Sequence, residues 1–157
     1  GSKKSFNDYQ VGELIDHIDG NTICEADHLF ATRLWQNNSK VHFDINARED
    51  KKRLIYGGHI ISLVRALSFN GLENAQLIVG INGGTHANPA FAEDTIYCWS
   101  EVLEKIDLNV RNIAALRLRS VGTKEKNHSM KVKSDDGRYL PTTVLDFDYW
   151  VLVPREL

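Results

Sequence analysis

The stretch YGGHIISLVRALSFNG, residues 56–71, decides how the rest of the chain must be arranged. It opens with the pair Gly57-Gly58 and closes with Gly71. Between them lie apolar side chains on every side and a single charged residue, Arg65. Glycine at each end suits the start and stop of a helix. Because a helix that is apolar nearly all round has to be covered by other elements, we predict a buried helix over residues 58–70.

The segment before this helix combines a short strand with a second helix. Residues 14–18 read LIDHI and are followed by the turn pair Asp19-Gly20, which predicts a short strand and a turn. Residues 25–36 carry apolar side chains at helical spacing. Because Thr22 stands three residues before Glu25, the spacing of a capping box, we expect this helix to begin just after Thr22.

The segment after the buried helix is rich in strand patterns. Residues 76–81 form an apolar run, and residues 94–103, 113–121 and 143–153 alternate between apolar and polar side chains. Period-two alternation is typical of strands with one wet face. Residues 124–139 are polar and contain a turn signal, which predicts a hairpin tip or a mobile loop. This order of elements predicts an α+β fold in which an antiparallel sheet wraps around the long buried helix.

Length and composition favour one soluble unit. The 157 residues predict a single domain over residues 1–157, in which Gly1-Ser2 reads as the remnant of an expression tag. Hydrophobic residues make up 42% of the chain and charged residues 25%, as in ordinary globular domains. The formal net charge of -2 favours neither nucleic acid nor an anionic membrane surface as a partner.

The sequence shows no predicted transmembrane helix and no signal for export to an oxidising compartment. It contains no apolar run of about 18 residues, the length that would predict a transmembrane helix. Its first residues lack the apolar stretch of a signal peptide. Cys24 and Cys98 lie in no CxxC spacing, so we expect reduced thiols. Together these features predict a cytoplasmic protein.

Four short motifs, in this order and spacing, make the chain resemble a known family. They are FNDYQVG (6–12), TICEADH (22–28), YGGHIIS (56–62) and NPAFAEDT (88–95). Each is similar to a motif of the MaoC-like, or R-specific, enoyl-CoA hydratases and dehydratases. The resemblance implies a hot-dog fold and a lyase that adds water to, or removes it from, an acyl-CoA thioester. It implies no cofactor, because CoA enters as part of the substrate.

A closer likeness is to the C-terminal half of the mesaconyl-CoA hydratases, also called β-methylmalyl-CoA dehydratases. The segments LIYGGHIISL (54–63), ALSFNGL (66–72) and VLDFDYWV (144–151) carry it. Those enzymes join two hot-dog halves in one chain, whereas this chain has one half. The resemblance therefore implies a homodimer or higher homo-oligomer, or a dimer with a second polypeptide.

The family's catalytic segment holds an Asp and a His five residues apart, and here the matching stretch QNNSKVH (36–42) has Asn37 and His42. Asn37 can orient a water molecule but cannot take or give a proton. An imidazole has a reference pKa of about 6.5 and exists in either form near neutral pH. We therefore expect His42 alone to serve as base and acid, with Asp44 as a candidate to compensate. The alternative is that His42 only packs at the end of a loop.

The glycine pair suggests where the thioester oxygen binds. A helix N-terminus presents unpaired N–H groups and a positive dipole end, and glycine lets a substrate approach closely. The resemblance assigns the oxyanion role to the backbone N–H of Gly58 or of His59, with Gly57 beside them. Without the resemblance, a tight turn before a helix explains the two glycines equally well.

Further substrate contacts are candidates only. Arg53, Tyr56 and Ser62 are further candidates for substrate binding. Related sequences carry an Arg where this chain has Thr85, which disfavours a dicarboxylic acyl group if that Arg holds a carboxylate. Because a guanidinium grips a carboxylate in bidentate fashion, Arg53 is a candidate substitute.

The remaining histidines do not suggest a metal site. His59 and His86 are typical capping or packing residues when taken singly. His17, His28 and His128 have no cluster partners at metal-ligand spacing, so we expect no bound metal.

Three functions stay open from the sequence. The first is a hydratase/dehydratase for a 2-enoyl-CoA, with a short branched acyl group such as mesaconyl-CoA as one candidate. The second is an acyl-CoA thioesterase, because one fold can host several chemistries. The third is a non-catalytic acyl-CoA-binding or partner subunit, which the replacement of the family Asp by Asn37 would suit.

Overall fold

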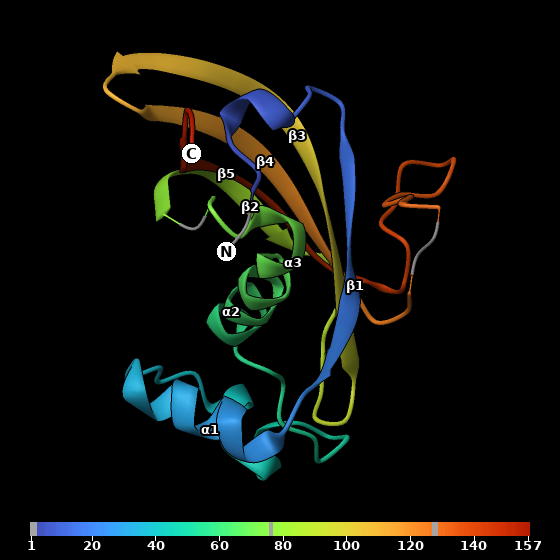
Figure 1. The fold of residues 1–157 in the computed structure, drawn as a ribbon. Coiled ribbons are helices and arrows are strands. Elements are labelled where there is room, and N and C mark those ends of the chain that lie inside the picture. The colour runs from blue at the N-terminus through green and yellow to red at the C-terminus, as the bar shows by residue number, and fades with distance from the viewer. Residues whose placement is uncertain (1–2, 76, 127–128) are drawn as a thin grey trace.

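One antiparallel sheet curls around one helix in the computed structural model, which describes residues 3–75, 77–126 and 129–157 (Figure 1). The sheet has five strands in the order β1-β3-β4-β5-β2, and each neighbouring pair is antiparallel. Its strands are β1 (Leu14–Thr22), β2 (Leu77–His86), β3 (Thr95–Val110), β4 (Ile113–Thr123) and β5 (Thr143–Pro154). The helices are α1 (Glu25–Leu34), α2 (Gly57–Leu67) and the short α3 (Phe69–Leu72), with single 3-10 turns at Phe6–Asp8, Lys40–His42 and Ile45–Ala47.

Helix α2 lies in the curve of the sheet and anchors the core. Ile60 and Val64 are buried on its inner face and pack in one cluster with side chains of the sheet such as Leu116 and Tyr149. The backbones come especially close at Gly122 of β4, where an added Cβ would lie 2.7 Å from Cγ2 of Val64. The α+β hot-dog arrangement predicted from the sequence is confirmed.

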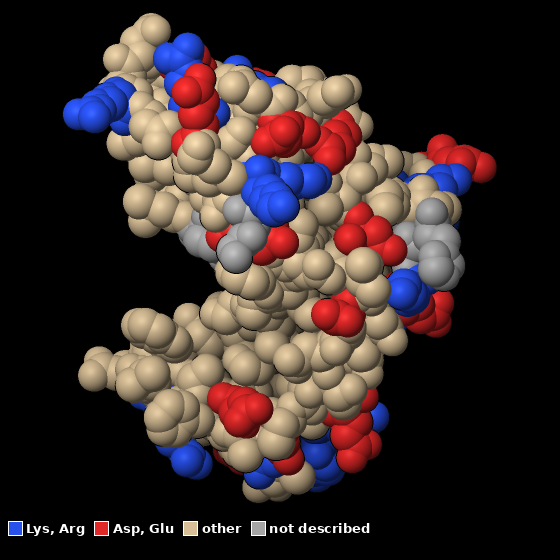
Figure 2. Space-filling model, viewed as in Figure 1, with Lys and Arg blue, Asp and Glu red and all other residues tan. Residues whose placement is uncertain are grey.

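The central helix differs from the prediction at its C-terminal end. It ends at Leu67, because the backbone leaves helical geometry at Asn70 and at Gly71, whose φ is +104°. Ser62 and Ala66 of α2 are exposed, so the helix is covered on one side and not all round. Seen from the same side as in Figure 1, the molecular surface has a deep notch at the level of α2 (Figure 2).

Strand β1 is longer than predicted, and the expected turn at Asp19-Gly20 is wrong. The strand runs on to Thr22, and its pairing with β3 shifts register between Asp16 and Gly20. Ile18 takes a φ of 65° at this point, and its N–H donates to the carboxylate of Asp16 over 2.9 Å. The turn residues therefore form a β-bulge inside a strand, which bends the strand without ending it.

Helix α1 is confirmed, but its predicted capping box is wrong. The N-cap residue is Cys24, and no side chain caps the helix there. Thr22 belongs to β1 instead, where its hydroxyl lies 2.8 Å from that of Thr95 on β3. The local pattern predicted that Thr22 caps the helix, but its side chain bonds to the neighbouring strand instead.

The four predicted strands after the helix are confirmed as β2 to β5. The described parts of the polar connection, residues 124–126 and 129–139, form a loop as predicted, with a bridge between Lys133 and Tyr139. Part of it packs on the sheet, because Val132 is buried against Trp99 and Val121. The expected tag remnant Gly1-Ser2 and His128 lie outside the described residues. Within the described ranges, no helix is long and apolar enough to cross a membrane.

The close approach at Gly122 generates a stability prediction. Gly122→Ala places a methyl group against Val64 in a packed core, and such overpacking typically costs about 1–3 kcal/mol. The free energy of unfolding, measured by urea denaturation, should fall by that amount. Gly83→Ala is the matched control, because an added Cβ at Gly83 of β2 meets nothing within 4 Å. Equal stability of the two variants would contradict the packing account.

Candidate functional site

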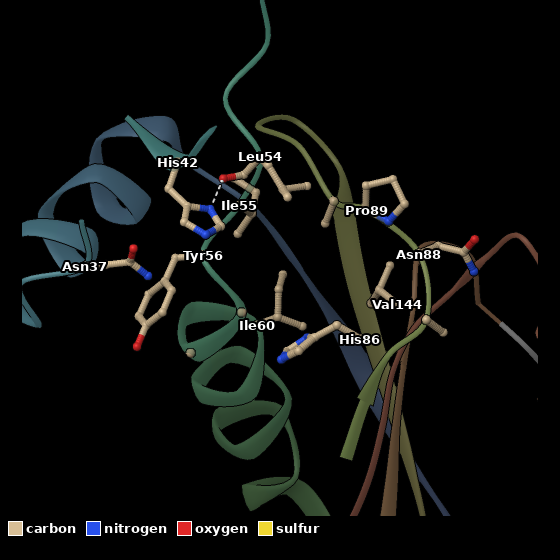
Figure 3. A pocket seen from close by; sticks show the side chains of 14 residues that line it. Asn37, His42, Leu54, Ile55, Tyr56, Ile60, His86, Asn88, Pro89 and Val144 are labelled. Atoms are coloured by element: carbon tan, nitrogen blue, oxygen red, sulfur yellow. Dashed lines mark hydrogen bonds between the residues drawn. The ribbon is translucent and has the colours of Figure 1, made fainter. Parts of the chain in front are cut away.

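A pocket of about 550 Å³ opens at the N-terminal end of α2. Three chain segments and one strand meet there: residues 37–42 after α1, residues 54–60 leading into α2, residues 86–90 after β2, and Val144 of β5 (Figure 3). The pocket therefore gathers Asn37, His42 and the glycine pair, which the sequence analysis singled out separately.

His42 is held in a defined orientation at the pocket wall. It ends a single 3-10 turn, Lys40–His42, and its Nδ1 lies 2.8 Å from the carbonyl oxygen of Leu54 (Figure 3). A carbonyl oxygen can only accept, so Nδ1 carries the proton. In the neutral ring Nε2 is then left with its lone pair, which is the form that a general base needs.

Asn37 lies on the same side of the pocket as His42 (Figure 3). Its Oδ1 accepts a hydrogen bond of 2.9 Å from the backbone N–H of Ser39. The NH₂ group of the Asn37 side chain is therefore the part that is left to interact with a ligand. It can donate hydrogen bonds but cannot transfer a proton.

The first turn of α2 supplies backbone donors. The N–H groups of His59 and Ile60 both donate to the carbonyl oxygen of Tyr56, over 3.0 Å and 3.3 Å. The N–H groups of Gly57 and Gly58 find no acceptor among the described residues. Such free groups at the positive end of a helix dipole suit an oxygen that gains negative charge.

Both glycines are required by their neighbours in the pocket. A Cβ on Gly57 would lie 2.6 Å from Nε2 of His86, and a Cβ on Gly58 would lie 2.6 Å from Cζ of Tyr56. The two rings therefore lie directly against the start of the helix. Tyr56 joins the pocket as the sequence analysis expected of a substrate-binding candidate.

Other candidates from the sequence lie outside the pocket lining. His59 is one, and its N–H is already bonded to Tyr56, which leaves Gly57 and Gly58 as the donors. Arg53 is another, since it forms an ion pair of 2.7 Å with Glu25 and so is not free to grip a substrate carboxylate.

Ser62 and Asp44 also lie outside the pocket lining. The hydroxyl of Ser62 donates to the carbonyl of Gly58 within the exposed face of α2, over 3.0 Å. Asp44 caps the next 3-10 turn by accepting from the N–H of Asn46 over 2.9 Å. Asp44 is therefore occupied with the backbone and does not replace the family Asp.

Two histidines at the site were missed by the sequence reasoning. His86, at the end of β2, lines the pocket across from His42, and burial lowers its pKa (Figure 3). His28 of α1 is fully buried, with its ring centroid 6.5 Å from those of His42 and His59. Only the register of β2 and the packing of α1 bring them here, and no local pattern signals either.

No acidic residue, lysine or arginine is among the residues that line the pocket. Polarity comes instead from two imidazoles, two amides, the phenol of Tyr56 and the helix end. Across residues 3–75, 77–126 and 129–157, no group of three or more His, Cys, Asp or Glu is placed to hold a metal ion.

Two curated relatives match nearly the whole chain. It is 57% identical over 155 residues to a protein named mesaconyl-CoA hydratase from Cereibacter sphaeroides. It is 53% identical over 160 residues to one named β-methylmalyl-CoA dehydratase from Chloroflexus aurantiacus. Each match covers 99% of this chain but only 45% and 46% of the relatives, so the chain spans about half of their length. No protein-family model matches the chain.

Solved structures agree with these relatives. A protein from Chloroflexus aurantiacus described as a MaoC domain dehydratase superposes with a TM-score of 0.95 at 52% identity, covering 100% of this chain and 46% of that one. A protein from Mycobacterium tuberculosis described as a double hot-dog fold gives a TM-score of 0.70 at 16% identity, covering 96% and 44%. The second likeness shows the fold alone. The resemblance to MaoC-like hydratases and dehydratases is confirmed.

Histidines with a lowered pKa generate a pH prediction. Burial lowers the pKa of His17, His28 and His59 below the ordinary value of 6.5, so the folded state binds fewer protons than the unfolded state near that pH. Their contribution to stability is complete above pH 6.5 and is lost as the pH falls below it. The carboxylates with lowered pKa values, such as Asp146 and Asp148, lose their contribution to stability only when the pH falls below 3.8.

The free energy of unfolding, measured by urea denaturation, should therefore decrease between about pH 7.5 and about pH 5. The decrease should be smaller in a His28→Asn variant, because asparagine does not titrate. A stability that is constant or increases over this range would contradict the neutral state of these imidazoles.

Proposed function

Because the chain matches half of each of two proteins named as a CoA hydratase and a CoA dehydratase, we propose that it is a hydratase/dehydratase for a 2-enoyl-CoA thioester. One observation carries the proposal. His42, whose Nε2 has its lone pair, lines the same pocket of about 550 Å³ as Gly57 and Gly58, whose N–H groups are free. A base and an oxyanion site are the two groups that this reaction needs.

The addition of water begins at Cβ of the substrate. The imidazole of His42 takes one proton from a water molecule through Nε2 while the water oxygen bonds to Cβ. The electron pair of the Cα=Cβ bond moves toward the thioester, so its oxygen gains enolate charge. The N–H groups of Gly57 and Gly58 stabilise that oxygen, and one such donor is typically worth about 2.7–4 kcal/mol in catalysis.

The reaction closes when the same imidazole returns its proton. His42, now positively charged, donates from Nε2 to Cα, and the enolate electrons form the new C–H bond. One water has then been added as H and OH, and the imidazole is neutral again. Dehydration is the reverse sequence. The cycle uses no cofactor, and CoA takes part only as the carrier of the acyl group.

The composition of the pocket lining favours this function over hydrolysis of the thioester. A thioesterase usually uses a carboxylate near the thioester, and none lines the pocket. Asn37 supplies a donor that can hold the attacking water or the acyl group, so the site is complete for one-base hydration. A short branched acyl group such as mesaconyl is the first candidate substrate, on the strength of the relatives' names.

A second copy of this chain, or a second polypeptide, forms part of the proposal. Strand β2 is at the edge of the sheet, and Leu77, Val79 and Ile81 on it are 63%, 53% and 64% exposed. An apolar edge strand of this kind tends to pair with another chain. The relatives are about twice as long, and one structural neighbour is described as a double hot-dog fold. The free thiols Cys24 and Cys98 suit the cytoplasm as the proposed compartment.

The first functional prediction concerns His42. His42→Ala should lower kcat for hydration of crotonyl-CoA or mesaconyl-CoA by about 10²–10⁴-fold, because it removes the base that takes the proton from water. The loss of enoyl-thioester absorbance measures hydration, and a thiol reagent measures release of CoA. Ser62→Ala is the control and should leave kcat unchanged, since Ser62 lies outside the pocket lining.

Other results of the same assay would replace the proposal. Unchanged turnover by His42→Ala would remove His42 from the chemistry. Release of CoA by the wild-type protein without hydration would indicate a thioesterase. Tight binding of CoA esters with neither reaction would indicate a binding or partner subunit.

The second functional prediction concerns assembly. Light scattering after size-exclusion chromatography should give at least twice the chain mass of 17.8 kDa. Val79→Lys should shift the protein toward the monomer, because it places a charge on the apolar edge. Gly83→Ala, on the same strand but without added charge, is the control. A wild-type monomer at all concentrations would contradict self-association and leave a second polypeptide as the partner.

A further inference from the structure

His28 connects the two chain segments of the proposed site but does not line the pocket itself. Its side chain comes from α1 and is fully buried. Nε2 lies 2.9 Å from the carbonyl oxygen of His42, and Nδ1 lies 3.1 Å from the backbone nitrogen of Tyr56. His42 bears the base, and Tyr56 immediately precedes the glycine pair that bears the oxyanion donors.

The two contacts fix the state of the ring. A carbonyl oxygen can only accept, so Nε2 of His28 carries the proton. The backbone N–H of Tyr56 can only donate, so Nδ1 must present its lone pair. A doubly protonated ring would set N–H against N–H at Tyr56. Burial lowers the pKa of His28, which favours the same neutral form.

This arrangement closes a ring of hydrogen bonds around the site. His42 bonds through its side chain to the carbonyl of Leu54, and Leu54 donates its N–H to the carbonyl of Val41 over 2.9 Å. His28 then ties the backbone of His42 to Tyr56, two residues beyond Leu54. The two segments are thereby held at a set separation, which is what a base and an oxyanion site acting on one substrate require.

We propose that His28 is a positioning residue, which holds the imidazole of His42 and the first turn of α2 in register for catalysis. The proposal rests on the proposed function. His28 does not touch the substrate, because it is absent from the pocket lining. A misplacement of about 1 Å at a reacting group can cost about 10²-fold in rate, so loss of the bridge should reduce kcat more than it changes KM.

His17 provides a matched control for the effect of losing a buried histidine. It is also fully buried, with Nδ1 2.6 Å from the carbonyl of Asn70 and Nε2 2.8 Å from the hydroxyl of Ser100. It lies on β1 and is not part of the pocket lining. Substitution at either position removes two buried hydrogen bonds, but only His28 links parts of the site.

The experiment compares kcat, KM and thermal stability for substitutions at the two positions. His28→Leu should lower kcat by about tenfold to a hundredfold with little change in KM. His28→Asn keeps an acceptor near the position of Nδ1, and His28→Gln keeps a donor near that of Nε2. Each should recover part of the lost kcat. If His28→Leu does not fold, these two variants still test the role of His28. His17→Leu should lose stability but keep kcat within about twofold.

A second readout does not depend on turnover. Ring ¹⁵N chemical shifts should show His42 protonated at Nδ1 in the wild type and a mixture of tautomers in the His28 variants, but not in His17→Leu. If the wild type hydrates enoyl-CoA and the His28 variants keep both kcat and the His42 tautomer, the positioning role is wrong and the proposed function stands. If the wild type is inactive, the proposed function fails, and unchanged His42 shifts in the His28 variants would overturn the positioning role separately.

Discussion

The first turn of helix α2 carries N–H groups that the helix itself cannot satisfy, and the rest of the site is arranged around them. The sheet holds this helix through Ile60 and Val64, with Gly122 allowing close contact, so the N-terminus comes to rest at the pocket. Glycine at positions 57 and 58 then leaves room for the rings of His86 and Tyr56 against the helix start. Core packing thus determines where an oxyanion can be stabilised.

The site has no acidic residue, lysine or arginine in its lining, and burial favours the uncharged form of His28 beside it. Hydrogen bonds in such surroundings are stronger than in water, because less solvent competes for them. In the proposed reaction, charge develops on the thioester oxygen and on His42. The proposal thus assigns hydration to a chain that lacks the family Asp, with Asn37 as a donor and the imidazole of His42 for proton transfer.

Local patterns in the sequence predicted the elements whose structure depends on nearby residues. The glycine-led apolar helix and the four strands after it belong to this class, whereas the choice of His42 and Asn37 came from the resemblance to the family's catalytic motif. The features that failed depend on distant partners. Asp19-Gly20 forms a bulge because β1 continues to pair with β3, and Thr22 bonds to Thr95 and so caps no helix. Nothing near His28 or His86 in the chain signals that tertiary packing brings both to the site.

In the proposed reaction, Gly57 and Gly58 polarise the thioester carbonyl of the substrate while His42 promotes addition of water to its double bond. The most direct measurement is the ¹³C chemical shift of an enoyl-CoA labelled at the thioester carbon and bound to the His42→Ala variant, which should bind without turnover. Hydrogen bonds from the helix end withdraw electrons from the carbonyl, so the account predicts a downfield shift on binding. A carbonyl signal at the position of free substrate, under conditions of saturated binding, would contradict it.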